Sequence, residues 1–215
     1  SSSTYYSEKE TQSVYASANL AYNNYLFLSV TGRNDWSSTL PASNRSFFYP
    51  SANLSFVFTD GLDMKGGVLS YGKVRAGWAQ VGNDTDPYRT VATYAPSSST
   101  WNGVTLYSYT RQIPPLNLKP EITGSFEVGT ELRFWNDRLW LDATYYKTAT
   151  KNQIMSVDVS RTTGFGSSLI NAGNIQNQGV EVQLGGRPVA KSDGLLWDVN
   201  VNWAANRNKV VELFP

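Results

Sequence analysis

Three glutamates, Glu121, Glu127 and Glu131, fall on alternate positions of one stretch and could support acid–base chemistry. Most glycosidases place a pair of carboxyl groups on either side of the scissile bond, so we first consider that activity. Residues two apart on one face of a strand lie about 7 Å from each other, and these three are spaced more widely. The sequence offers them no water-excluding pocket. We therefore interpret the three carboxylates as part of a hydrated wall facing Lys73 and Arg133, and we predict no enzyme activity and no catalytic residue.

The 215-residue chain contains no cysteine and no histidine. This composition excludes disulfides, Cys/His zinc sites and Cys- or His-based triads built within the chain. Oxygen ligands gather in Asn83-Asp84-Thr85-Asp86, which suggests calcium, but the run lacks the spacing and the bidentate glutamate of an EF-hand loop. We interpret the run as a turn where a strand ends, and we predict no metal and no cofactor.

Four aromatic residues are our candidates for substrate binding: Trp36, Trp101, Tyr107 and Tyr109. The last three fall in the longest connection of the chain, among serine, threonine and asparagine, and Trp36 falls in the first long connection. Flat rings beside hydroxyl and amide groups are a common way to hold sugars or peptides. Packing within the loop itself, or contact with a partner subunit, explains the same residues equally well.

The elements that must position these residues are strands, because apolar and polar residues alternate with period two throughout the chain. In one example Trp197, Val199, Val201 and Trp203 alternate with polar residues. We predict eight strands, at 11–22, 25–32, 46–58, 70–82, 121–135, 138–149, 174–186 and 196–206. No run of about 18 apolar residues occurs, so a spanning helix is excluded.

Composition agrees with an all-β protein that has one wet and one apolar surface. Charged residues make up 16% of the chain and aromatic residues 13%, and 18 basic residues nearly balance 17 acidic ones. A net charge of +1 gives no strong field toward nucleic acid, so we predict no nucleic-acid partner. Either a β-sandwich or a membrane barrel would fit this balance.

Short and long connections alternate along the chain. Asn23-Asn24 and Asn136-Asp137 are two-residue hairpin signals, and moderate connections fall near 59–69 and 187–195. Long connections fall near 33–45, 83–120 and 150–173. An outer-membrane barrel has tight turns at one rim and long loops at the other, so the alternation favours a barrel over a sandwich.

Aromatic residues beside the tight turns suggest the belts that flank a membrane. Tyr22 and Tyr25 flank the first turn, and Trp135 and Trp140 flank the second. A sandwich could bury the same rings, so the face carrying Trp197 and Trp203 discriminates between the two folds. That face should be bare in a barrel and covered by a second sheet in a sandwich.

The connection pattern places both chain ends on the side of the long loops. A complete small barrel normally has both ends on the other side, so we expect a contiguous eight-strand segment of a larger transmembrane barrel. No export signal opens the printed residues.

Five segments of the chain, in order, resemble TonB-dependent outer-membrane transporters of the SusC/RagA type. They are Tyr49-Pro50-Ser51-Ala52-Asn53-Leu54-Ser55-Phe56, the run from Lys73 to Asp84, the run from Leu118 to Phe134, the run from Asn136 to Tyr146, and the run from Asn171 to Glu181. The likeness covers roughly residues 13 to 212.

The resemblance implies a fold and a function. Members of that family are Gram-negative outer-membrane barrels of 22 strands with a plug domain, and they import glycans or peptides. TonB energises uptake, and a SusD-like surface lipoprotein acts as a lid. On this basis residues 1–215 are expected to be a partial barrel without the plug, in contact with outer-membrane lipid, the lid and an oligosaccharide or peptide cargo. A soluble β-sandwich carbohydrate-binding module is the alternative function.

Overall fold

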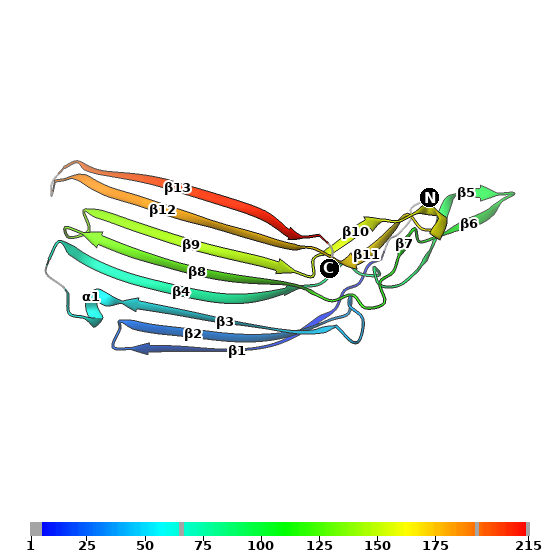
Figure 1. The fold of residues 1–215 in the computed structure, drawn as a ribbon, viewed down its shortest axis with the longest axis horizontal. Helices are drawn as coiled ribbons and strands as arrows, with labels where there is room; N and C mark the ends of the chain where they lie inside the picture. Colours follow the sequence, from blue (N-terminus) through cyan, green and yellow to red (C-terminus); the bar gives the residue numbers. More distant parts are fainter. Residues whose placement is uncertain (1–5, 65–66, 192–193, 214–215) are drawn as a thin grey trace.

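One eight-stranded antiparallel sheet dominates the computed structural model, which describes residues 6–64, 67–191 and 194–213 (Figure 1). Its strands are β1 (Thr11–Tyr22), β2 (Leu26–Ser37), β3 (Ser46–Val57), β4 (Leu69–Asn83), β8 (Glu121–Phe134), β9 (Leu139–Lys151), β12 (Asn174–Ala190) and β13 (Leu196–Glu212). All eight predicted strands are present. The predicted all-β fold, with strands that run up and down, is confirmed.

The strands follow one another across the sheet in chain order, β1-β2-β3-β4-β8-β9-β12-β13. Tight turns lie at one rim, which we call the short-turn rim, and the elaborate connections lie at the other, the long-connection rim (Figure 1). β1 begins and β13 ends at the long-connection rim, as the alternation of connections predicted. Residues 65, 66, 192 and 193 of the two moderate connections lie outside the described residues.

The first tight turn falls at the predicted Asn23-Asn24 but takes three residues, 23–25, rather than two, so Tyr25 lies within the turn. The second turn differs more in length. Asn23 and Asn24 have φ values of 45° and 58°, and Tyr22 pairs with Leu26. This left-handed pair matches the right-handed twist of the flanking strands. The second turn takes four residues, 135–138, rather than two. Positive φ values of 51°, 54° and 65° at Trp135, Asn136 and Asp137 carry the chain round.

The register gives the sheet two chemically different faces. The polar face carries charged and amide side chains in cross-strand rows, for example Asn53 and Gly77 beside Glu127. The opposite, apolar face carries Leu54 beside Ala76 and Val128, and Val182 beside Trp203. Trp140 lies on the polar face, where it pairs with Arg133 and Gly185, so its predicted place in an aromatic belt on the apolar face is wrong.

No second layer covers the apolar face within the described part of the chain. Trp78 on β4 and Phe126 on β8 belong to central strands, yet their side chains remain 42% and 44% exposed. The other two sheets lie beyond the long-connection rim rather than against this face (Figure 1). A β-sandwich would bury these rings, so the sandwich alternative is excluded.

The long connections contain strands that periodicity did not predict. The 83–120 connection forms the two-stranded hairpin β5 (Tyr94–Trp101) and β6 (Val104–Tyr109), then β7 (Gln112–Ile113). The 150–173 connection contains β10 (Ile154–Asp158), the 3₁₀ turn η1 (Arg161–Thr163) and β11 (Ser167–Asn171). β10, β11 and β7 form a three-stranded sheet. β2 runs on to Ser37, so the first long connection is shorter than the predicted 33–45.

A small hydrophobic cluster lies at the long-connection rim. Leu118 is fully buried, and it packs with Leu40, Phe47 and Leu169. These four residues come from three long connections and the start of β3. The cluster therefore joins segments that are far apart in sequence.

The described residues include one short α-helix, α1 (Phe58–Gly61). Within the same ranges no helix has the length and apolar character needed to cross a membrane.

Candidate functional site

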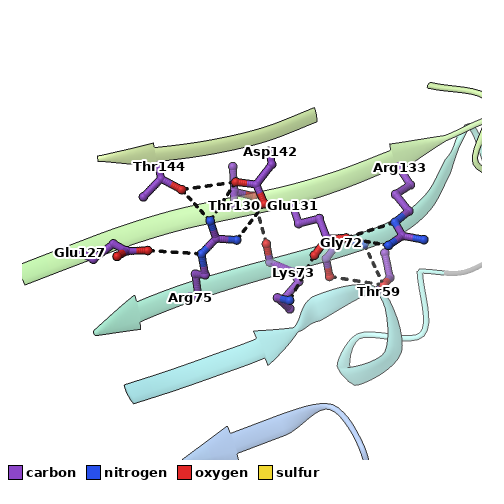
Figure 2. Close-up of polar contacts among 10 residues, drawn as sticks. All are labelled: Thr59, Gly72, Lys73, Arg75, Glu127, Thr130, Glu131, Arg133, Asp142 and Thr144. Atoms are coloured by element: carbon purple, nitrogen blue, oxygen red, sulfur yellow. Dashed lines mark hydrogen bonds and ion pairs between the residues drawn. The ribbon is translucent and has the colours of Figure 1, made fainter. Parts of the chain in front are cut away.

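The polar face of β4, β8 and β9 carries a network of ion pairs (Figure 2). Arg75 on β4 donates from its Nη1 and Nη2 atoms to the two carboxylate oxygens of Asp142, at 2.9 and 2.8 Å. Nη2 of Arg75 also donates to Thr144 Oγ1 at 2.6 Å, and Nε lies 3.7 Å from Glu127 Oε1. Two parallel N–H···O bonds are the strongest way to hold an arginine beside a carboxylate. The guanidinium group is therefore fixed flat against the sheet.

Glu131 forms a second group of ion pairs beside the first, with Lys73 and Arg133. Its Oε2 atom accepts from Lys73 Nζ at 3.1 Å, and its Oε1 atom accepts from Arg133 Nη2 at 2.8 Å. The predicted contact of these glutamates with Lys73 and Arg133 is thus present at Glu131. Glu121 accepts from the backbone N–H of Ile154 at 2.7 Å and from Asn83 Nδ2 at 3.2 Å. The carboxylates of Glu121 and Glu131 are occupied by structural partners, which agrees with a wall rather than an acid–base pair.

Glycine on β8 and β12 makes room for long side chains from the neighbouring strands. A Cβ atom at Gly129 would lie 2.9 Å from Arg75 Nε and 3.0 Å from Thr144 Oγ1. A Cβ atom at Gly185 would lie 2.1 Å from the Trp140 ring. Arg75 can cross β8 to reach β9 only because Gly129 has no side chain.

A hollow in the polar face opens between β8 and β13. Its floor carries Glu127, Asp142 and Glu181, with polar neighbours Ser125, Thr148, Gln183 and Asn202. Hydroxyl, amide and carboxylate groups on this floor can hydrogen-bond a hydrated solute.

The structure separates the predicted aromatic candidates. In the β5–β6 hairpin, Tyr107 pairs with Pro96 and Tyr109 pairs with Tyr94. The register is irregular between Pro96 and Thr100, and beyond this irregularity Trp101 pairs with Val104. Because side chains alternate along a strand, Trp101 and Val104 lie on the hairpin face opposite Tyr107 and Tyr109. The hairpin projects beyond the long-connection rim (Figure 1).

Two further aromatic residues join Tyr109. Its ring centroid lies 5.0 Å from that of Tyr94 and 5.9 Å from that of Phe165, which follows η1. The sequence analysis missed both residues. Tyr94 and Pro96 are two positions apart, a spacing that could have indicated one face of a strand. No local sequence signal connects Phe165 with a hairpin more than fifty positions earlier.

Trp36 lies in β2 rather than in a loop. It shares the apolar face with Leu28 and Val30, and its side chain is 38% exposed. The structure therefore does not bring Trp36 together with the aromatic residues of the hairpin.

Asp84 anchors the start of the chain. It accepts from Lys9 Nζ at 2.5 Å and from Ser37 Oγ. Burial raises the pKa of the Asp84 carboxyl group, but the bonds from Lys9 and Ser37 outweigh burial and hold the pKa below its ordinary value. Among the described residues no group of three or more acidic side chains is placed to hold a metal.

Hydrogen bonds reinforce the hydrophobic cluster at the long-connection rim. Asn171 Nδ2 donates to the carbonyls of Lys119 and Asn152, at 2.8 and 2.9 Å, and its Oδ1 atom accepts from Lys119 N–H at 2.8 Å. Asn44 Nδ2 donates to Asn117 Oδ1 at 2.7 Å. Three separate connections are therefore fastened into one unit.

A sheet that is polar on one face, bare and apolar on the other, and looped at one rim is the wall of a transmembrane β-barrel. Residues 1–211 match the family described as TonB dependent receptor-like, beta-barrel, and the chain belongs to that family. It is thus part of an outer-membrane barrel of Gram-negative type, in a family of receptors rather than enzymes.

Sequence relatives support the assignment. The chain is 30% identical to TonB-dependent receptor P26 of Formosa agariphila over 97% of its own length, which is 21% of that receptor. It is 27% identical to TonB-dependent receptor P3 of the same organism, over 98% of this chain and 21% of that receptor. The chain therefore spans about a fifth of the curated relatives that it matches.

Solved structures share the fold. The RagAB peptide transporter superposes with a TM-score of 0.86 at 22% identity, over 96% of this chain and 23% of that one. The siderophore receptor PirA from Pseudomonas aeruginosa superposes with a TM-score of 0.59 at 20% identity, over 94% of this chain and 35% of that one. The higher score for RagAB agrees with the resemblance noted from the sequence.

Proposed function

We propose that the chain forms part of the barrel wall of an active transporter that imports peptides or glycans and is energised by TonB. The main observation behind this proposal is that the two faces of the sheet differ: the polar face is suited to a hydrated lumen wall, and the bare apolar face is suited to contact with lipid. Membership of a TonB-dependent family supports the source of energy. The likeness to a structure described as a peptide transporter favours peptides as cargo.

A SusD-like lipoprotein lid is the proposed partner at the long-connection rim. The β5–β6 hairpin projects from that rim with Trp101 and Tyr107 exposed, at 71% and 65%. Large exposed aromatic side chains on a projecting arm are typical of a contact surface. The two hairpin faces could serve different contacts, because Trp101 lies opposite Tyr107.

Cargo contact is proposed for Trp101, Tyr107, Tyr109 and Trp36. The rings of Tyr109, Tyr94 and Phe165, which meet at tilted angles of 58°, give one face of the hairpin an aromatic cluster that a sugar ring or peptide side chain could contact. We also propose cargo contact for Trp36, which lies apart from the hairpin, at the end of β2 near Gln12 and Arg45.

Uptake by cells carrying the complete receptor gene tests this function. Cells that lack the gene should lose uptake of fluorescent oligopeptides or oligosaccharides, and a TonB deletion should give the same loss. Replacing Tyr107 and Tyr109 by alanine should reduce cargo binding at least severalfold, as expected when stacked rings are removed. Undiminished uptake of both cargo classes in the deletion strain would refute the proposal.

Co-purification of the complete receptor tests the lid. A tagged receptor should retain a surface lipoprotein, and replacing Trp101 by alanine should weaken that association without reducing the amount of receptor in the membrane. Replacing the exposed Val104 of the same hairpin face by threonine is the matched control for a small change at that surface.

A further inference from the structure

The apolar face changes character as β9, β12 and β13 approach the long-connection rim. Two neighbouring cross-strand rows are apolar throughout: Ala143, Val182 and Trp203, then Tyr145, Val180 and Ala205. The next row towards the rim holds Lys147, Gln178 and Arg207. Lys209 lies on the same face one row further on, opposite Gln176, and Lys151 lies on it at the end of β9. We call Lys147, Lys151, Arg207 and Lys209 the basic patch.

The basic patch lies just past the depth that the hydrocarbon layer occupies. On β13 the apolar stretch runs from Trp197 to Ala205, which spans about 27 Å along the strand at about 3.4 Å per residue. A strand tilted by about 40° converts this length to about 21 Å of depth, close to the roughly 25 Å apolar band of outer-membrane barrels. Lys147, Arg207 and Lys209 therefore lie at the depth where the lipid headgroups begin.

Among the described residues the cations of the patch have no counter-charge. Within the described ranges none of its side chains forms an ion pair or a side-chain hydrogen bond, and all four residues are exposed. The cations Arg75 and Arg133 on the polar face are both paired with carboxylates. Glu212, near the end of β13, instead accepts from Asn174 Nδ2 at 3.1 Å.

We infer that the basic patch binds the phosphate groups of anionic lipids in the membrane leaflet on the long-connection side. Charge complementarity and depth support this occupant: cations just beyond an apolar band meet headgroup phosphates, and attraction of this kind acts within about 10 Å. Gln178 lies between Lys147 and Arg207, and Gln176 lies beside Lys209 and donates to Gln178 Oε1 at 3.2 Å. The amide N–H groups of the pair that remain can donate to phosphate oxygens. The inference rests on the apolar face being the lipid-facing one, and not on the identity of the cargo.

A binding titration on the complete receptor in a neutral detergent tests the patch. Dihexanoyl phosphatidate is the anionic probe, and dihexanoyl phosphatidylcholine is the zwitterionic one. Replacing Lys147→Gln, Arg207→Gln and Lys209→Gln together should weaken phosphatidate binding roughly a hundredfold, at roughly fivefold per cation. Phosphatidylcholine binding should not change. The single variants Lys147→Gln and Arg207→Gln, each expected to weaken binding roughly fivefold, decide the case if the triple variant does not fold.

Two controls separate a site from an effect of net charge. Lys119→Gln, Arg161→Gln and Lys191→Gln together remove the same charge from residues outside the eight long strands, and this variant should bind phosphatidate normally. The charge-conserving variant Lys147→Arg, Arg207→Lys and Lys209→Arg should keep binding within about twofold, since each cation near the surface contributes similarly.

Three results would overturn the inference: unchanged phosphatidate binding in the glutamine variants, an equal loss in the control triple, or inorganic phosphate competing as well as phosphatidate. The last would assign the patch to free phosphate instead of lipid. Cargo uptake is measured on the same variants, because uptake can fail or persist independently of lipid binding. A failure of the lipid-binding inference is thereby distinguished from a failure of the transport proposal.

Discussion

Arg75 and Asp142 are joined by two hydrogen bonds of 2.9 and 2.8 Å although their strands, β4 and β9, are not neighbours. β8 lies between them, and Arg75 is opposite Gly129 in the register. The guanidinium group therefore passes over a glycine to reach the second strand along. This bridge ties three strands together on the polar face and does not depend on the backbone ladder.

A side chain at Gly129 should break this bridge. Gly129→Val places atoms within 3.0 Å of Arg75 and Thr144, so we expect a loss of about 1–3 kcal/mol in the free energy of unfolding. Gly124→Val is the matched control, because a Cβ atom at Gly124, on the opposite face of β8, would have no neighbour within 4 Å. Denaturant unfolding of the complete receptor measures both. Equal losses in the two variants would show that the bridge is not what Gly129 protects.

Removing the charge of Asp142 should destabilise the same three strands. Asp142→Asn leaves Arg75 with Glu127 at 3.7 Å as its remaining ion pair, and we expect a loss of about 1–2 kcal/mol because the pair is partly solvated. Asp198→Asn removes a carboxylate from the exposed pair with Arg187 and should cost less. Thermal unfolding followed by circular dichroism compares the two, and an equal shift in Tm would contradict the expected difference.

Acid should release the first residues of the chain. The pKa of Asp84 is lowered, so its contribution to stability is fully present above the unfolded value of 3.8 and is lost as pH falls through the lower folded value. Amide exchange near Lys9 and Glu10 should therefore rise steeply only below about pH 4. In Asp84→Asn the same amides should exchange rapidly at every pH. A steep rise that persists in this variant would assign the effect to another group.

The first hairpin turn should tolerate glycine but not a β-branched residue. Asn24 has a φ of 58°, a region that costs an ordinary residue about 1–2 kcal/mol and costs glycine very little. Asn24→Val should lower the free energy of unfolding by about that amount, and Asn24→Gly should leave it nearly unchanged. Denaturant midpoints provide the measurement. Similar midpoints for the two variants would mean that the turn relaxes to another conformation.

Asn171 should control the order of the long-connection rim. Asn171→Ala removes three hydrogen bonds to Lys119 and Asn152, so amide exchange at Lys119 should increase at least tenfold while exchange in β8 stays unchanged. Asn208→Ala on β13 is the control, since within the described ranges the side chain of Asn208 forms no hydrogen bond. Unaltered exchange at Lys119 would show that the buried Leu118 alone holds the connection.

The long strands and their order were predictable from the sequence because alternation of polar and apolar residues survives over ten or more positions. Asn23-Asn24 was equally predictable, since the two residues tolerate left-handed conformations. The four-residue turn at 135–138 was not predictable, because it places a tryptophan at positive φ, a backbone conformation that tryptophan rarely adopts. Trp140 lies on the polar face because it is in phase with Asp142 and Thr144 along β9, and a two-residue turn would have left the register of β8 with β9 the same.

Long-range contacts limited how much of the candidate site could be predicted from the sequence. The glutamates were correctly assigned to a charged wall, but the bridge from Arg75 to Asp142 depends on strand order and on a glycine in a third strand. The aromatic candidates were separated by an irregular register in a hairpin that periodicity did not detect. Phe165 joins Tyr109 only through the fold of the rim.

Two adjacent groups of ion pairs, one around Arg75 and one around Glu131, together contain three cations and three carboxylates: Lys73, Arg75 and Arg133, and Glu127, Glu131 and Asp142. The opposite signs interleave and cancel over a few ångströms, so this stretch is electroneutral to anything more than a side chain's length away. On the proposed transport function, a solute passing this stretch would meet no net charge there. Under that proposal, discrimination among solutes would rest on shape and on the polar groups around these ion pairs, among them the carboxylate of Glu181.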